Sequence, residues 1–385
     1  MPGGSGVRVM LGKHRIILDQ WSEVYDLLRD YADQEFWRFA DVDFDPEAIT
    51  IIGRVQLKEN YYRICDLAER YPGRVMFCNP AEGSQTILLQ LRRLRIEDLV
   101  RTGKILLLTS GDLEPPWSYI KTDCYFSNVC EYTENIQAST HSVRDSAHRP
   151  FDFLLFNGRL RPHRKYLLHR LRELDLLDRG LWTCLDRRCD MRWTSYLTLP
   201  YQDRDRMDEP EEIHLLPKEY EIERAVNNLE RELPDRDVKH FLFNNTWGDA
   251  IVNPRCYEHT AFSIVTETIY DYPFTFRTEK IWKPMIMAHP FVAVANVGYY
   301  RALQAAGFRT FSNLIDESFD EIWEPRERME AIIEVIQDIV RNGAEAFLMA
   351  SEDTCKYNQQ HLREYNRCER AALPQTIIDF LDARS

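Results

Sequence analysis

The sequence predicts an α/β fold in which short buried strands alternate with longer amphipathic helices. Apolar runs of about four to six residues recur along the chain, and segments with apolar side chains at helical spacing separate them. The strand-like runs are continuously apolar, which is typical of a parallel sheet with helices on both faces. This alternation occurs twice, before and after about residue 150. We therefore expect two α/β halves.

The first half alternates candidate strands and helices as far as about residue 140. Each strand is a short apolar run, and each helix carries apolar residues on one face. The strands are expected at residues 7–10, 49–52, 74–78 and 105–108, and the helices at residues 21–31, 61–71 and 84–94.

The second half resumes the alternation after residue 150. Its first helix is expected to begin near Pro162, because proline suits the first turn of a helix. Residues 186–236 are polar and rich in Asp, Arg and Pro, and we expect there a long excursion with a helix at 219–232. The other strands are expected at residues 151–156, 241–243, 262–266 and 290–295, and the other helices at 279–287, 298–305, 326–341 and over the last forty residues.

The join between the halves predicts the domain organisation. Residues 1–145 would form an N-terminal Rossmann-like domain, residues 150–350 a C-terminal Rossmann-like domain, and residues 351–385 C-terminal helices. We expect the two Rossmann-like domains to face each other across a cleft. Ligands of such sheets bind outside the carboxyl ends of the strands, so the candidate functional residues are those that directly follow strands.

The composition excludes several classes of protein. The 49 Lys and Arg against 62 Asp and Glu give a formal net charge of −13, which excludes a uniformly basic nucleic-acid binder. No run approaches the roughly 18 apolar residues that span a bilayer, and the first residues lack the pattern of a signal peptide. The nine cysteines are scattered without a Cys-x-x-Cys pair, so we expect reduced thiols in a cytoplasmic protein.

The strongest pattern lies at the end of the expected strand 262–266. Glu267 follows that strand directly, and Thr278, Glu279 and Lys280 open a helix from eleven residues later. Thr278 can cap the helix, and an acidic Glu279 suits its first turn. One interpretation is a capped helix with a solvated salt bridge. The other is a nucleotide site, in which helix N–H groups and Lys280 face phosphate while Glu267 or Glu279 accepts hydrogen bonds from ribose.

Residues 255–325 resemble the C-terminal domain of fucosyltransferase-like glycosyltransferases. The similarity rests on the run from Ser263 to Glu267, on the Thr-Glu-Lys-Ile-Trp-Lys-Pro run that begins at Thr278, and on His289-Pro-Phe and Gly307-Phe-x-x-Phe. The resemblance implies a GT-B architecture, a nucleotide-sugar donor held by the C-terminal domain, and inversion at the anomeric carbon. It also implies that Glu279 contacts the ribose and Lys280 the diphosphate. In this fold the last helices frequently pack back on the N-terminal domain, and we expect the same of residues 351–385.

A basic stretch lies just after the join. Residues 144–192 carry 12 Lys and Arg against 7 Asp and Glu. One interpretation is a solvated basic helix face. The other is a diphosphate clamp, since guanidinium groups match phosphate oxygens, and the resembled family also places an arginine here. We assign this role to Arg159 and Arg164, which with Lys280 would neutralise the leaving group in place of a metal ion.

Transfer to an acceptor hydroxyl needs a general base. Asp112 and Glu114 follow the expected strand 105–108, and a desolvated carboxylate can be tuned to act as a base. They are also explained as a turn residue and a surface glutamate. His14 is a rival, because histidine needs little tuning.

We therefore predict a metal-independent, inverting glycosyltransferase that takes a nucleotide-sugar co-substrate and no resident cofactor. Asp-x-Asp pairs at 41–43, 203–205 and 235–237 match a metal-binding pattern of other glycosyltransferases, but such pairs are common in acidic chains. The acceptor would be a glycan or lipid-linked saccharide. The alternatives are a phage-type DNA glycosyltransferase acting on a hydroxymethylated base, a non-catalytic nucleotide- or sugar-binding module, and a nucleotide-sugar epimerase.

Overall fold

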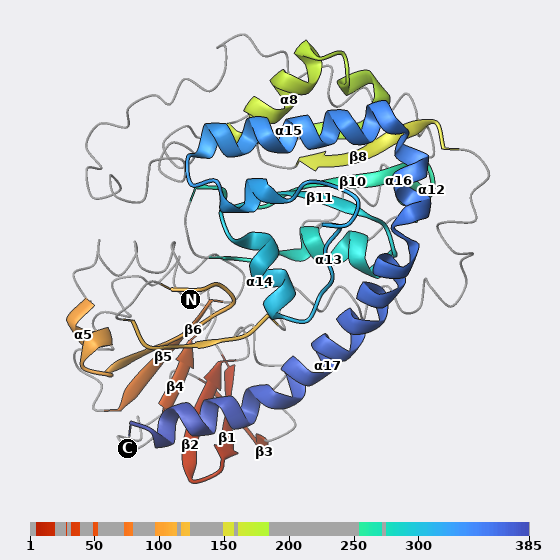
Figure 1. Cartoon of the computed structure of the whole chain (residues 1–385). Coiled ribbons are helices and arrows are strands. Elements are labelled where there is room, and N and C mark those ends of the chain that lie inside the picture. The colour runs from red at the N-terminus through yellow and green to blue at the C-terminus, as the bar shows by residue number, and fades with distance from the viewer. Residues whose placement is uncertain are drawn as a thin grey trace. The chain divides into compact units, whose positions relative to one another are not determined.

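A computed structural model describes residues 5–19, 28, 32–38, 49–52, 73–79, 97–113, 117–123, 149–157, 161–184, 254–271 and 275–384. The chain divides into two compact units. Unit 1 combines Met1–Phe126 with Tyr365–Ser385, and unit 2 is Ser127–Glu364. The long helix α17 (Glu352–Asp382; dark blue in Figure 1) contributes its first part to unit 2 and its last part to unit 1.

Unit 1 is built on a seven-stranded sheet with the order β3-β1-β2-β4-β5-β6-β7. Strands β2, β4, β5, β6 and β7 pair in parallel, and α5 lies before β6. These elements are β1 (Ser5–Leu11), β2 (His14–Asp19), β3 (Ala32–Arg38), β4 (Ile49–Ile52), β5 (Arg74–Asn79), α5 (Glu97–Arg101), β6 (Ile105–Thr109) and β7 (Tyr119–Lys121).

The expectation of a purely parallel sheet is wrong at one edge of unit 1. Strand β1 pairs antiparallel with both β2 and β3. Only Gly12 and Lys13 separate β1 from β2, and a two-residue turn leaves no room for the crossover that parallel strands need. Gly12 takes a φ of 58°, a conformation that glycine adopts without steric cost.

The core of unit 1 includes residues from both ends of the chain. Leu373, Ile377 and Leu381 follow one another at intervals of four, so they share one face of α17. All three are buried in the same apolar cluster as Val9, Leu11, Ile16, Leu28, Ile49, Met76, Cys78, Leu106, Leu108 and Ile120.

Unit 2 is built on a four-stranded sheet with the order β11-β10-β8-β9, and every pairing in it is parallel. This confirms the α/β class and the parallel sheet expected from the apolar runs. The strands are β8 (Phe151–Asn157), β9 (Gly180–Cys184), β10 (Thr260–Thr266) and β11 (Phe291–Val294).

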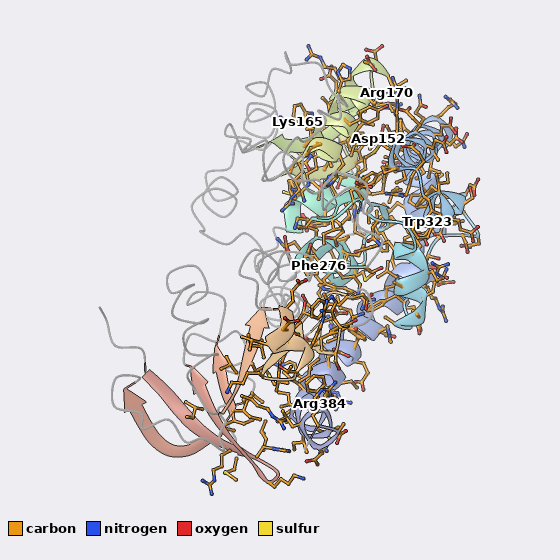
Figure 2. The ribbon with its side chains drawn as sticks, turned by 90° about the vertical axis from the view of Figure 1, so that its left-hand side faces the viewer. Asp152, Lys165, Arg170, Phe276, Trp323 and Arg384 are labelled. Atoms are coloured by element: carbon orange, nitrogen blue, oxygen red, sulfur yellow. The ribbon has the colours of Figure 1, made fainter. Side chains whose placement is uncertain are left out.

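The helices expected after Pro162 and at 279–287, 298–305 and 326–341 are present as α8, α13, α14 and α15, and α15 packs on α8. Arg170 of α8, which is labelled in Figure 2, donates hydrogen bonds from Nε and Nη2 to Glu330 of α15, at 3.1 Å each. The helices are α8 (Pro162–Glu173), η3 (Leu177–Arg179), α12 (Pro254–Glu258), α13 (Glu279–Ile286), α14 (Tyr299–Ala305), η5 (Ser318–Glu321), α15 (Pro325–Asn342) and α16 (Ala344–Ala350).

Several predicted elements lie outside the described residues. These are the helices expected at 21–31 (apart from Leu28), 61–71, 84–94 and 219–232, and the strand expected at 241–243. Strands β2, β3, β7 and β9 and helices α5 and α12 are not among the elements that the sequence predicts. No helix within the described ranges is long and apolar enough to cross a membrane.

Candidate functional site

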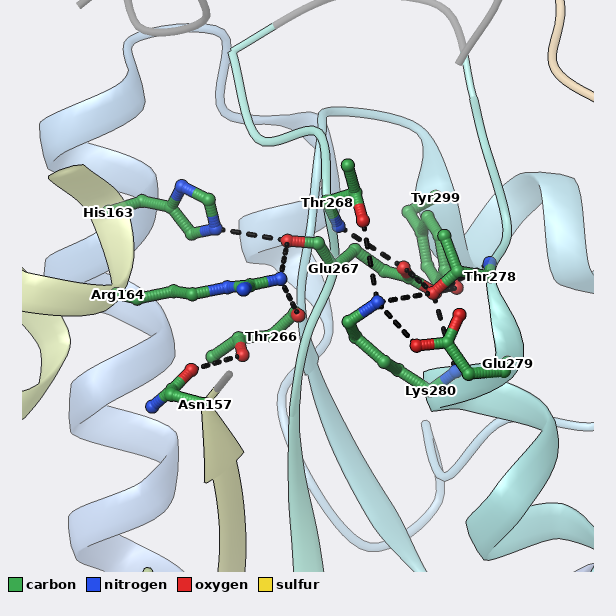
Figure 3. A network of polar contacts seen from close by, with 10 residues as sticks. All are labelled: Asn157, His163, Arg164, Thr266, Glu267, Thr268, Thr278, Glu279, Lys280 and Tyr299. Carbon is green, nitrogen blue, oxygen red and sulfur yellow. Dashed lines mark hydrogen bonds and ion pairs between the residues drawn. The ribbon is translucent and has the colours of Figure 1, made fainter. Parts of the chain in front are cut away.

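Four of the predicted site residues come together at one edge of the unit 2 sheet. All four strands of that sheet are parallel, so their carboxyl ends lie at the same edge. Glu267 directly follows β10, and Thr278, Glu279 and Lys280 form the N-terminal end of α13. Figure 3 shows the polar network that joins these residues.

Glu267 is fully buried, and its carboxylate accepts four hydrogen bonds. Its Oε1 accepts from the backbone N–H of Thr278 at 3.2 Å and from the hydroxyl of Tyr299 at 2.7 Å. Its Oε2 accepts from Thr278 Oγ1 at 2.6 Å and from the backbone N–H of Thr268 at 3.3 Å. Both oxygens are therefore committed inside the protein. Glu267 therefore holds Thr268 and Thr278 in position, whereas the sequence suggested a contact of this carboxylate with ribose.

Thr278 caps α13, as its sequence position predicts. Its hydroxyl donates to Glu267 and accepts from the backbone N–H of Lys280 at 3.3 Å and from Lys280 Nζ at 3.1 Å. A hydroxyl has one proton to donate and two lone pairs to accept with, so Thr278 Oγ1 is saturated. The buried carboxylate thus fixes the cap, and the cap fixes the lysine.

Glu279 and Lys280 form the partly exposed part of this network. Lys280 Nζ lies 2.7 Å from Glu279 Oε1, and the two side chains are 25% and 13% exposed, respectively. Burial raises the pKa of Glu279, but the charges of Lys280 and Lys283 and a hydrogen bond from Lys280 outweigh this and lower it on balance. Glu279 is therefore ionised at neutral pH in the first turn of α13, where the helix dipole also favours a negative charge.

Arg164 has a structural role at the end of β10 and is placed differently from the expected diphosphate clamp. It is buried in α8, and its Nη2 donates to the carbonyl oxygens of Thr266 at 2.9 Å and Glu267 at 3.1 Å. A guanidinium in this position holds the main chain in place just before Thr268. Arg159, the other expected clamp residue, lies outside the described residues.

His163 supports the same carbonyl. Its Nε2 lies 3.0 Å from the carbonyl oxygen of Glu267, and its ring stacks on Tyr270 with centroids 5.2 Å apart. Burial and the charges of Arg164 and Arg161 hold the pKa of His163 well below its ordinary value. The ring is therefore neutral, and its Nε2 carries the proton that is donated to the carbonyl.

In unit 1, Asp112 lies beyond the carboxyl end of β6, the position expected for a functional residue. Its Oδ1 forms a 2.6 Å ion pair with Lys121 Nζ, and about a third of each side chain is exposed. Glu114 lies outside the described residues. Of the two carboxylates proposed as general base, Asp112 is the one that lies within the described residues, and it forms an ion pair with Lys121.

His14 does not share that edge of the sheet. It begins β2, which runs parallel to β4, β5 and β6, so it lies at the opposite edge from Asp112. Its Nε2 is 2.8 Å from Asp382 Oδ1 near the end of α17, and Lys13 Nζ is 2.9 Å from the same oxygen. The structure therefore separates these two candidate bases.

Sequence reasoning missed a buried carboxylate at the end of β7. Asp123 accepts a hydrogen bond from the Tyr365 hydroxyl at 2.8 Å, and its backbone N–H donates to Glu369 at 3.1 Å. The signal that could have found it is the polar Thr122-Asp123 pair directly after a short β-type run. In unit 2, no sequence pattern indicated the role of Tyr299, because its hydroxyl is brought to Glu267 by tertiary packing.

Among the residues that the structure describes, no three His, Cys, Asp or Glu side chains gather in a way that could hold a metal ion. Comparisons of the chain with protein-family models, with curated proteins and with solved structures give no match. The similarity to fucosyltransferase-like enzymes therefore stays a prediction from residues 255–325.

Proposed function

We propose that this protein is a GT-B glycosyltransferase, in which unit 2 binds the donor, a nucleotide-activated sugar. The observation that carries the proposal is the start of α13, where an ammonium, an ionised carboxylate and a capped helix N-terminus meet at the carboxyl edge of a parallel sheet. Helix N-termini and ammonium groups bind phosphate. Carboxylates accept hydrogen bonds from ribose hydroxyls.

The proposed division of labour uses the two partly exposed side chains. Lys280 binds a phosphate of the donor and Glu279 accepts from its ribose, while buried Glu267 and Arg164 hold the strand end and the helix cap in position. Arg159 would add a second positive charge near the diphosphate. Fixed charges of this kind stabilise the negative charge that develops on a leaving group.

The proposed reaction is a direct displacement with inversion, independent of a metal ion. The acceptor oxygen forms a bond to the anomeric carbon of the sugar as the bond from that carbon to the phosphate oxygen breaks. The nucleotide leaves with the electron pair of the broken bond, and the acceptor proton passes to a carboxylate, for which Asp112 and Glu114 are the candidates. We propose a glycan or lipid-linked saccharide as the acceptor, because a net charge of −13 disfavours DNA.

A donor screen tests this proposal. UDP-, GDP-, CMP- and dTDP-sugars are each added to the full chain, and the melting temperature is measured. We expect at least one to raise it, and no stabilisation by any of them would contradict the donor site.

The lysine variant localises the binding. Lys280→Ala should weaken binding of the selected nucleotide at least about tenfold, a typical loss for a charge-assisted contact. Lys356→Ala is the matched control, because Lys356 is an exposed lysine of α17 in an ion pair with Glu352. Equal affinities of the Lys280→Ala variant and the wild type would move the phosphate contact elsewhere.

A non-catalytic nucleotide-binding module is the second candidate. The observation that favours it is the 2.6 Å ion pair between Asp112 and Lys121, which already occupies one oxygen of the candidate base. The module predicts nucleotide binding without transfer and without slow hydrolysis of the donor. Release of free nucleotide over hours, measured with and without EDTA, separates the two candidates.

A further inference from the structure

The ammonium of Lys280 uses all its protons inside the protein. Its Nζ donates to Glu279 Oε1 at 2.7 Å, to Thr278 Oγ1 at 3.1 Å and to Thr268 Oγ1 at 3.4 Å. An ammonium has three protons and no lone pair. A phosphate can therefore bind Lys280 only by replacing one of these three oxygens.

The three oxygens are not equally replaceable. Thr278 Oγ1 is held by Glu267 and by the helix cap, whereas Thr268 Oγ1 is neutral, belongs to a partly exposed residue and makes the longest of the three contacts. Glu279 is partly exposed, and its carboxylate carries the only charge among the three groups. Replacing only the long Thr268 contact would leave a phosphate dianion beside the ionised Glu279 carboxylate, and the two negative charges repel each other. Glu279 is therefore the group that must give way.

We propose that Glu279 is an internal competitor for the phosphate site and makes it selective for nucleoside diphosphates over inorganic pyrophosphate and phosphate. A bare phosphate must break the Glu279–Lys280 pair and leaves an ionised carboxylate beside new negative charge. A nucleoside diphosphate breaks the same pair but offers its ribose hydroxyls to the released carboxylate. Breaking the Glu279–Lys280 ion pair costs binding free energy, and only a ligand that carries a ribose as well as phosphate offsets this cost. This inference rests on the proposed function for the ribose contact.

The experiment measures binding of inorganic pyrophosphate to the full chain by isothermal titration calorimetry. We compare the wild type with Glu279→Gln, which keeps the size of the side chain and removes its charge. We expect pyrophosphate to bind Glu279→Gln at least about tenfold more tightly, because its charged competitor is gone. Glu279→Ala should behave in the same way, and alanine is a good helix former, so the test does not depend on one variant folding well.

Two further variants test whether the gain in pyrophosphate affinity depends on Glu279 and Lys280. Asp338→Asn is the matched control, because it also removes one negative charge from an ion pair of unit 2, the exposed Asp338–Arg341 pair of α15. It should leave pyrophosphate affinity unchanged. The double variant Glu279→Gln with Lys280→Gln should lose the gain, because the phosphate would have no ammonium to bind.

Three results would overturn the inference. They are an unchanged or weaker pyrophosphate affinity in both Glu279 variants, an equal gain in Asp338→Asn, and a gain that survives in the double variant. A separate titration of the wild type with nucleoside diphosphates tests the proposed function. If the Glu279 variants bind pyrophosphate more tightly but the wild type binds no nucleoside diphosphate, Glu279 competes for the phosphate site but the proposed donor site is wrong. Failure of this inference and failure of the proposed function are therefore distinguishable.

Discussion

Each carboxylate oxygen of Glu267 accepts one hydrogen bond from a backbone N–H group and one from a hydroxyl. A hydroxyl can turn and accept instead of donate, but a backbone N–H cannot. In Glu267→Gln the side-chain amide must direct its NH₂ group at one of the two backbone N–H donors. A residue of the same shape is therefore a poor replacement here.

We expect Glu267→Gln to lower the free energy of unfolding of unit 2 by about 1–3 kcal/mol, the range for a buried polar group left without a suitable partner. Tyr299→Phe removes one hydroxyl donor only and should cost about 1 kcal/mol. Urea unfolding followed by hydrogen exchange of β10 peptides measures both. Equal costs for the two variants would mean that the backbone donors do not depend on the carboxylate.

The neutral His163 predicts a dependence of stability on pH. The unfolded chain takes up a proton on this residue near pH 6.5, whereas burial and Arg164 keep the pKa in the folded chain far lower. The unfolded state therefore binds more protons as the pH falls below about 6.5, and the folded state loses stability there, by at most about 1.4 kcal/mol per pH unit. Above about pH 6.5 the histidine is neutral in both states, so it no longer lowers the free energy of unfolding.

His163→Gln should remove this part of the acid sensitivity, because glutamine can still donate to the carbonyl but does not titrate. The control is His169→Gln, which changes a partly exposed histidine of the same helix that pairs with Glu173. Unfolding free energies at pH 7.5, 6.5 and 5.5 make the comparison. An unchanged slope in His163→Gln would assign the acid sensitivity to other groups.

At the scale of the element, α13 depends on its cap. Thr278→Ala removes the hydroxyl that accepts from Lys280 and donates to Glu267, so we expect a loss of about 1–2 kcal/mol of stability. Thr278→Ser keeps the hydroxyl and should cost less than half as much. Denaturant titrations measure both losses, and the same loss in the serine variant would show that the methyl group matters more than the cap.

Elements of this kind could be predicted where local chemistry decides them. The continuously buried strands β6, β10 and β11 and the Thr278 cap follow from the sequence alone. The partners of Glu267 did not follow, because Tyr299 lies 32 residues away and reaches the carboxylate through tertiary packing. The carbonyl contacts of Arg164 did not follow for a related reason, since an arginine near a strand end can serve a ligand or the main-chain carbonyls of a neighbouring strand.

At the scale of the whole molecule, helix α17 completes unit 1. Leu381 is fully buried in the cluster formed by strands at the other end of the chain. We expect Leu381→Ala to destabilise unit 1 by about 2–5 kcal/mol and to raise hydrogen exchange in β1, β5 and β6. Gln375→Ala is the control, since Gln375 is exposed on the same helix. Unchanged exchange in those strands would mean that α17 is not needed to hold the sheet.

The composition of unit 1 from two distant segments also sets an order of events during synthesis. The last sheet strand of unit 1 is made by residue 121, but Leu381 appears about 260 residues later. At roughly 5–20 residues per second this is a delay of roughly 13–50 seconds. Every residue of unit 2 leaves the ribosome before the core of unit 1 can close. The first sheet to be translated is therefore the last to be finished.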